Sequence, residues 1–228
     1  MREIVLDTET TGFEYKQGHR IVEIGCVELD NHMPTGRTYH QYINPERDMP
    51  DGAFRVHGLS EEYLRDFPLF KEVAQEFLDF IGDTPLIIHN AGFDVPFLNW
   101  ELKAHKFPEM ENNVVDTLII ARKKFPGSPA NLDALCRRFS IDNSNREKHG
   151  ALLDSELLAE VYLELIGGRQ PGLLLAKEAK GADEIAAKEH IFREPRPHRA
   201  NEEELAAHAV FLEKITNPIW LADTSKDN

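Results

Sequence analysis

Carboxylates placed beside short apolar segments are the feature of this chain that most restricts its fold. Asp7 and Glu9 close the first apolar run, and Asp94 and Asp154 stand at or near the starts of two expected helices. A buried carboxylate without a partner is costly, and divalent cations, which prefer oxygen ligands, are a natural way to neutralise it. Together with His149, these acids predict a two-metal hydrolytic site.

The chain has 228 residues, which suits one domain of ordinary size with an appendage. No apolar run reaches the length of a membrane span, and the first is too short for a signal peptide. We therefore expect a cytoplasmic protein that does not contact a membrane. Cys26 and Cys136 are expected to be buried free thiols in a reducing compartment.

The net charge of −14 argues against binding nucleic acid through bulk electrostatics. It does not exclude a nuclease, because bound metal ions supply positive charge at the site and a partner can hold the polymer. Short basic clusters, among them Arg146 with Lys148, are interpreted as solvated helix ends.

The spacing of apolar residues predicts a mixed sheet covered by helices. Strands are expected over residues 3–7, 20–29, 38–43, 85–89 and 114–115. Helices are expected over residues 68–81, 95–105, 117–124, 131–139 and 152–166. Gly167 and Gly168 end the last of these helices.

The composition changes after Gly168. Residues 169–200 are rich in Gly, Ala, Lys, Glu and Pro and predict a flexible linker. Asn201 with Glu204 forms a capping-box pattern that predicts the start of a final helix. The predicted parts of the chain are therefore a catalytic domain, a linker and a tail, over residues 1–168, 169–200 and 201–228.

Each acidic motif could also have a purely structural role, and the residues alone do not decide between this role and metal binding. Asp7 and Glu9 share a face of a strand and could be a polar strand end in water. Asp94 suits a helix N-cap, and Asp154 suits the first turn of a helix, where the dipole favours acids. His149 titrates near neutral pH and suits a general base, although an isolated histidine is usually a surface residue. The joint pattern favours the catalytic interpretation, because all the separate explanations would have to hold at once.

Three motifs give a resemblance to a known family. They are Asp-Thr-Glu-Thr-Thr-Gly at 7–12, His-Asn-Ala-Gly-Phe-Asp at 89–94 and His-Gly-Ala-Leu-Leu-Asp at 149–154. They resemble the motifs of the DEDD exonucleases, and the spacing of His149 and Asp154 is that of the histidine subtype. Within it, the chain is similar to the proofreading (epsilon) subunits of bacterial DNA polymerase III. Shorter matches occur at Val56-His57-Gly58 and Asp116-Thr117-Leu118.

The resemblance implies a ribonuclease-H-like fold, in which helices flank a mixed sheet. It implies that two divalent cations, Mg²⁺ or Mn²⁺, are bound by Asp7, Glu9, Asp94 and Asp154. It also implies that His149 is the general base. Substrate contacts are implied for Thr8, Glu9, His57 and Asp154. The implied activity releases 5′-mononucleotides from single-stranded or mispaired DNA 3′ ends.

The partners that the resemblance implies are the polymerase III alpha subunit, the sliding clamp and a small theta-like subunit. Residues 170–175, Gln-Pro-Gly-Leu-Leu-Leu, are similar to clamp-binding peptides, and the alternative is an incidental apolar patch. The residues that fit this peptide are Gln170, Leu173 and Leu175. The tail is expected to dock on the polymerase subunit, and the alternative is a helix that folds back on its own domain. Its expected contact residues are Leu205, Leu212 and Trp220.

Three other functions are compatible with parts of the pattern. A free-standing DEDD exonuclease acting on RNA or oligonucleotides is the nearest, but it would not need the extension after Gly168. A non-catalytic scaffold would have no reason to keep all five expected catalytic residues. An endonuclease or transposase of the same fold would leave His149 without a role.

Overall fold

The computed structural model describes residues 1–146, 148–168 and 199–216 of the chain. The chain divides into two compact units, with the boundary after Leu174. The first unit holds the sheet and most of the helices, and the second contains the last helix. Among the described residues, no helix is long and apolar enough to cross a membrane.

One mixed sheet forms the centre of the first unit. Its strands within the described residues are β1 (Arg2–Thr10), β2 (Ile21–Asp30), β3 (Met33–Tyr42), β4 (Leu86–Ile88) and β5 (Val114–Asp116), in the order β3-β2-β1-β4-β5. Strand β1 pairs antiparallel with β2 and parallel with β4, and β4 pairs parallel with β5. The carboxyl ends of β1 and β4 therefore meet at the same edge of the sheet.

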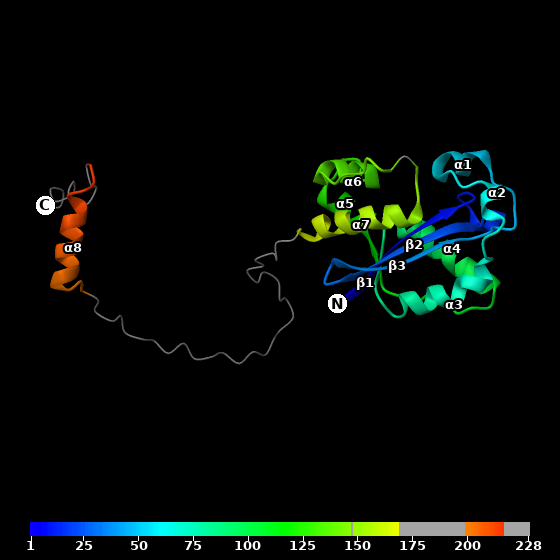
Figure 1. Ribbon diagram of the computed structural model, residues 1–228, viewed down its shortest axis with the longest axis horizontal. Coiled ribbons are helices and arrows are strands. Elements are labelled where there is room, and N and C mark those ends of the chain that lie inside the picture. The colour runs from blue at the N-terminus through cyan, green and yellow to red at the C-terminus, as the bar shows by residue number, and fades with distance from the viewer. Residues whose placement is uncertain (147, 169–198, 217–228) are drawn as a thin grey trace. The chain divides into compact units, whose positions relative to one another are not determined.

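Helices cover both faces of this sheet (Figure 1). One face carries α3 (Phe70–Ile81) and α4 (Ala91–Ala104), and the other carries α5 (Thr117–Lys124), α6 (Leu132–Phe139) and α7 (Ala151–Ile166). Two short helices, α1 (Asp51–His57) and α2 (Glu61–Leu64), follow β3. The predicted ribonuclease-H-like arrangement of a mixed sheet flanked by helices is confirmed.

Alternation along β1 divides the core into two parts. Ile4 and Leu6 pack with α3 and α4, whereas Val5 packs on the opposite face with α5, α6 and α7. All three side chains are fully buried. A buried aliphatic side chain contributes about 1.5–3 kcal/mol, so this short run ties both helical layers to one strand. The same alternation carries Asp7 and Glu9 onto the α7 face.

Gly25 allows α7 to approach the sheet closely. A Cβ atom at this position would lie 2.2 Å from the backbone carbonyl carbon of Ala151. The hydroxyl of Ser155 donates a hydrogen bond of 2.9 Å to the carbonyl oxygen of Gly25. Since Gly25 lies opposite Asp7 in the ladder between β1 and β2, this contact brings the first turn of α7 beside Asp7.

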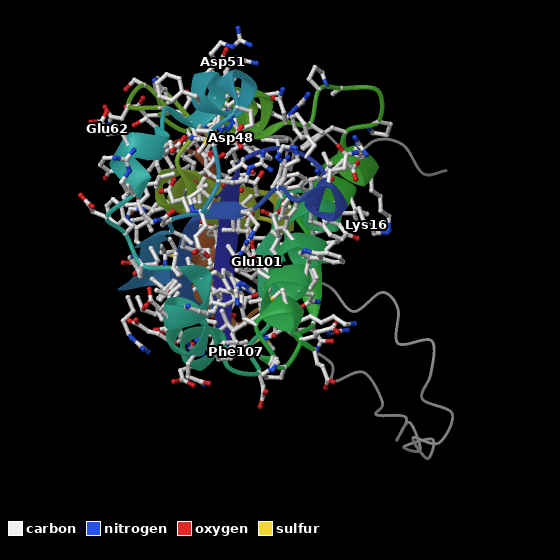
Figure 2. All side chains as sticks on the ribbon, turned by 90° about the vertical axis from the view of Figure 1, so that its right-hand side faces the viewer. Lys16, Asp48, Asp51, Glu62, Glu101 and Phe107 are labelled. Carbon is white, nitrogen blue, oxygen red and sulfur yellow. The ribbon has the colours of Figure 1, made fainter. Side chains whose placement is uncertain are left out.

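An ion pair fixes α4 to the start of β2. Arg20 donates from Nε and Nη2 to the two oxygens of Glu101 at 2.6 and 2.8 Å. Glu101 is almost fully buried and lies in the middle of the face shown in Figure 2. A bidentate pair of this kind is geometrically specific, so it sets the position of the helix that carries Asp94.

Most expected elements are confirmed to within a few residues, and the differences have local causes. Strand β3 begins at Met33 rather than residue 38, because Asn31 and His32 form a two-residue turn with positive φ values of 49° and 66°. Helices α1 and α2 were not among the expected elements. Phe54 and Val56 of α1 are 40% and 44% exposed, so the helix lacks the buried stripe that periodicity detects.

The second unit contains α8 (Glu202–Leu212). The Asn201 side chain accepts from the backbone N–H of Glu204 at 2.8 Å, and the Glu204 carboxylate accepts from that of Asn201 at 2.9 Å. The predicted capping box is therefore confirmed. Leu205 is 57% exposed and Leu212 is buried. The predicted partner contacts at Gln170, Leu173, Leu175 and Trp220 lie outside the described residues. The predicted domain boundaries stay predictions.

Candidate active site

The five residues predicted to form the site come together around one cavity of about 420 Å³. Asp7 and Glu9 lie on β1, Asp94 in the first turn of α4, and Asp154 in the first turn of α7. His149 lies in the loop that precedes α7. The cavity is therefore built at the carboxyl ends of β1 and β4, the edge that the sheet topology brings together.

Burial and mutual repulsion raise the pKa values of the acids on β1. Removal from water is the largest cause for Glu9, whose pKa rises to about 8, and the charges of Asp154, Glu23 and Asp94 add to it. The pKa of Asp7 is raised well above its ordinary value by burial and then by the neighbouring acids. Like charges this close disfavour the ionised form of each, so the cluster favours a bound cation.

Asp94 is buried and held by a hydrogen bond of 2.6 Å from the hydroxyl of Thr8. Burial raises its pKa to about 7 despite this bond. The alternative that Asp94 caps its helix is wrong, because α4 begins at Ala91 and its N-cap is Asn90. The carboxylate therefore points toward the cavity instead of closing a helix end.

Asp116 explains why α4 begins a turn earlier than expected. Its two oxygens accept the backbone N–H groups of Asn90 and Ala91, each at 3.2 Å. Asn90 adopts the left-handed conformation with φ of 71°. The same carboxylate caps α5 by accepting from Leu118 N at 2.9 Å. Asp116 thus fixes the turn that carries Asp94, a role that its sequence position did not reveal.

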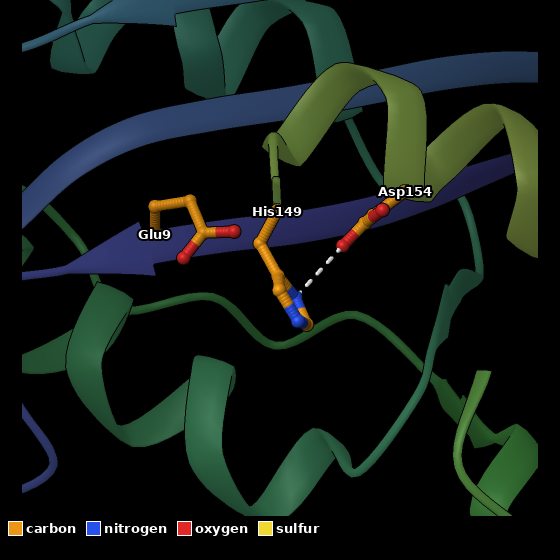
Figure 3. Close-up of side chains that lie close together, drawn as sticks. All are labelled: Glu9, His149 and Asp154. Carbon is orange, nitrogen blue, oxygen red and sulfur yellow. Dashed lines mark ion pairs between the residues drawn. The ribbon is translucent and has the colours of Figure 1, made fainter. Parts of the chain in front are cut away.

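Asp154 and His149 lie beside each other on either side of the start of α7. The Nδ1 atom of His149 is 3.3 Å from Oδ2 of Asp154, and Figure 3 shows both with Glu9 from β1. The Asp154 side chain is 4% exposed, whereas that of His149 is 48% exposed. Burial is the largest influence and opposes ionisation of Asp154, but hydrogen bonds and charges from Arg146 and His149 together outweigh it and hold the pKa of Asp154 below its ordinary value.

The prediction that Arg146 lies at a solvated helix end is wrong. Its side chain is 6% exposed, and it pairs with Asp154 and with Asp133 of α6. Lys148 does remain exposed, with its ammonium 5.2 Å from the centre of the Phe54 ring. The roles of Arg146 and Asp133 depend on the path of the loop between α6 and α7, which apolar periodicity does not describe.

A second cavity of about 400 Å³ adjoins the first, and the two share the lining residues Thr8, Glu9, Phe13 and Phe93. His57, at the end of α1, is buried and lines this cavity, and its Nδ1 accepts from the backbone N–H of Leu59 at 3.0 Å. Burial lowers the pKa of His57. The structure therefore places the predicted substrate contacts Thr8 and His57 around one space.

Two phenylalanines stand where these cavities meet. Phe93 packs against the buried Phe97, with ring centres 5.1 Å apart, and against Phe13 at 6.3 Å. Phe93 thus takes part in core packing and also lines both cavities. Phe13 is 83% exposed, an unusual position for a large apolar side chain. Its sequence context gives no signal beyond its place after the turn at Gly12.

The residues around the first cavity fit a divalent cation. Glu9, His149 and Asp154 can each offer one ligand atom, and these atoms lie within 4.8 Å of one another. Asp7 and Asp94 line the same cavity and have raised pKa values, which a nearby cation would lower again. Carboxylate oxygens are the ligands that Mg²⁺ and Mn²⁺ prefer.

Comparison with known proteins identifies the class of protein as the exonucleases. A family model described as exonuclease matches residues 4–162. The nuclease domain of 3′hExo, a DEDDh family member bound to rAMP, superposes with a TM-score of 0.64 at 20% identity, over 72% of this chain and 91% of that domain. Exonuclease X in complex with 5′ overhanging duplex DNA gives a TM-score of 0.57 at 24% identity, over 72% of this chain and 90% of that protein. At these identities the likeness establishes the fold.

The fold and the acidic cavity thus define an exonuclease of the DEDD type. Named proteins with similar sequences narrow the assignment from this class to one family. DNA polymerase III subunit epsilon of Rickettsia felis is 51% identical, over 94% of this chain and 97% of its own length. The same subunit of Escherichia coli K12 is 44% identical, over 94% of this chain and 93% of its own length. The chain belongs to the family of DNA polymerase III epsilon subunits.

Proposed function

We propose that this chain is a proofreading 3′–5′ exonuclease that releases 5′-mononucleotides from single-stranded or mispaired DNA ends. The observation that carries the proposal is the convergence of four acids and one histidine, from separate segments, on one cavity. The high identity to epsilon subunits along nearly the whole chain supports it. A scaffold protein would have no reason to maintain this costly cluster of like charges.

Each residue of the first cavity would have its own role in the reaction. Asp7, Glu9, Asp94 and Asp154 would hold two divalent cations, Mg²⁺ or Mn²⁺, which activate water and stabilise the departing 3′ oxygen. His149 would take the proton from the attacking water, because its ring lies at the mouth of the cavity beside Asp154. Thr8 would keep Asp94 oriented through its hydrogen bond of 2.6 Å.

The second cavity would receive the terminal nucleotide. Phe13 and Phe93 offer ring faces or edges for stacking, and His57 lines the same cavity. Stacking does not depend on base identity, so such a site accepts any frayed end. A mispaired end unpairs at lower cost than a paired one, and discrimination follows without contacts to base edges.

Partner binding would explain how a strongly acidic protein can act on a DNA substrate. With a net charge of −14, the chain has little electrostatic attraction for phosphates. Attachment to the polymerase III alpha subunit through residues 201–228, and to the sliding clamp through residues 170–175, would raise the effective concentration at the primer end. A small theta-like subunit is a further proposed partner.

A primer-degradation assay tests the reaction itself. DNA labelled at its 5′ end is incubated with the full chain and Mg²⁺, and we expect a ladder that shortens from the 3′ end by single nucleotides. Asp7→Asn, which keeps the shape but removes the charge, is the matched control and should be inactive. Internal cleavage, or degradation of RNA in preference to DNA, would contradict the proposal.

A further inference from the structure

Arg146 contacts two of the groups to which the proposed function assigns catalytic roles. Its Nε and Nη2 donate to the two oxygens of Asp154 at 2.5 and 2.6 Å, and Nη2 also lies 2.7 Å from Nδ1 of His149. Its Nη1 donates to Asp133 at 2.7 Å. All three guanidinium nitrogens therefore have partners that belong to the cavity lining.

Arg146 also contacts the ring nitrogen of His149 that lies beside Asp154. A guanidinium only donates hydrogen bonds, so Nδ1 of His149 must be the acceptor in its contact with Arg146. The same nitrogen also lies 3.3 Å from Oδ2 of Asp154. While Arg146 remains in this position, Nδ1 of His149 is engaged by the guanidinium and by Asp154 rather than open to a water molecule.

The same contacts set a condition on cation binding at Asp154. Both carboxylate oxygens already accept from a positive group whose side chain is 6% exposed. A divalent ion bound to Asp154 would lie close to this guanidinium in a site with little water, where like charges repel strongly. The ion and the guanidinium therefore compete for one carboxylate.

Asp133 gives the displaced guanidinium a place to remain. Its side chain is 41% exposed, so it can bind Arg146 while the rest of that side chain turns toward solvent. Arg146 is carried by the loop between α6 and α7, and its Nε–Asp154 and Nη1–Asp133 bonds leave from opposite ends of the guanidinium. Movement of the guanidinium about the Asp133 contact would break the bonds from Nε and Nη2 to Asp154 and keep one ion pair.

We propose that Arg146 is an internal cation that a divalent metal ion displaces from Asp154, and that the same displacement breaks the contact between Arg146 and Nδ1 of His149. The inference rests on the proposed metal-dependent hydrolysis. It couples the general base to metal loading: the carboxylate and the base are engaged by Arg146 together and released together. Hydrolytic competence then appears only when the metal ion is in place.

Metal affinity gives the first test. The Mn²⁺ dissociation constant of the full chain is measured from the free-ion signal in electron paramagnetic resonance, without DNA. We expect Arg146→Met to bind Mn²⁺ about tenfold or more tightly than the unaltered chain, because the competing charge is gone. The matched control is Arg137→Met, which removes an equal charge from an exposed position on α6 and should change little. Equal or weaker binding by Arg146→Met would overturn the proposal.

A second measurement does not depend on that variant folding. In ¹⁵N-labelled unaltered chain, the Nε–H resonance of Arg146 is identified by its loss in Arg146→Lys and then followed during Mg²⁺ titration. We expect a large shift or exchange broadening as the bond to Asp154 breaks. An unchanged resonance at saturating Mg²⁺, with binding shown by calorimetry, would overturn this inference and leave the proposed function intact. Absence of any metal binding would overturn both.

Discussion

The buried acids predict that the folded chain loses stability as pH rises when divalent cations are removed. The pKa of Glu9 rises from an ordinary 4.5 to about 8, and that of Asp94 from 3.8 to about 7. Because the folded state holds these protons more tightly than the unfolded state, their stabilising effect is complete below about pH 4. It is lost progressively as pH rises through 7 and 8.

The magnitude follows from the size of the shifts. Each unit of pKa difference corresponds to about 1.4 kcal/mol, so Glu9 alone accounts for about 5 kcal/mol and Asp94 for about 4 kcal/mol. The two groups belong to one cluster and their effects are not independent. We therefore expect the free energy of unfolding to fall by about 3–5 kcal/mol between pH 5 and pH 8.5.

Urea unfolding followed by circular dichroism measures this change, with EDTA present at each pH. Mg²⁺ should restore most of the lost stability at pH 8.5, since a cation between the carboxylates favours their ionised forms. The double variant Glu9→Gln/Asp94→Asn removes both titrating groups and should show a flatter profile. A free energy of unfolding that stays constant or rises from pH 6 to pH 8.5 in EDTA would refute the reasoning.

Three further predictions follow from the site and its supports. His149→Ala should lower turnover by about 100-fold or more while Mn²⁺ affinity stays nearly unchanged, as single-turnover kinetics and metal titration would show; full activity would contradict the base assignment. Gly25→Ala should lower the free energy of unfolding by about 1–3 kcal/mol and reduce activity, because α7 must move away from β2; Gly52→Ala, where nothing lies within 4 Å of the added Cβ, is the stability control in thermal melts. A chain ending at Gly168 should retain hydrolysis but fail to co-purify with the polymerase III alpha subunit, and co-purification would exclude the tail as the contact.

The positions of the acidic residues on β1 and α7 could be predicted from the sequence because each is tied to a regular element, and their catalytic role stays a prediction. Asp7 and Glu9 lie two residues apart on an apolar strand, which puts both side chains on one face. Asp154 lies in the first turn of a helix whose long apolar stripe predicts the helix start within one residue. In these cases local periodicity alone determines where the side chain points.

Residues whose positions depend on contacts between distant segments were not predicted. Asp116 lies 26 residues from Asn90, yet it determines where α4 begins. Arg146 has no periodic context, and its burial depends on Asp133 and Asp154 meeting across a loop. Gly25 looks like an ordinary strand residue until α7 is packed against it. Such roles become visible only when the segments are placed in space.

The ratio of the rate constants for removing a mispaired and a paired 3′-terminal nucleotide tests the central claim most directly. It is measured with the full chain in Mg²⁺ on two primers that differ only in the terminal base, with Asp7→Asn as control. The account predicts removal of the mispaired nucleotide about tenfold or more faster, because the mispaired end unpairs at lower cost, and no removal by the control. Equal rates for the two primers, or undiminished removal by Asp7→Asn, would contradict it.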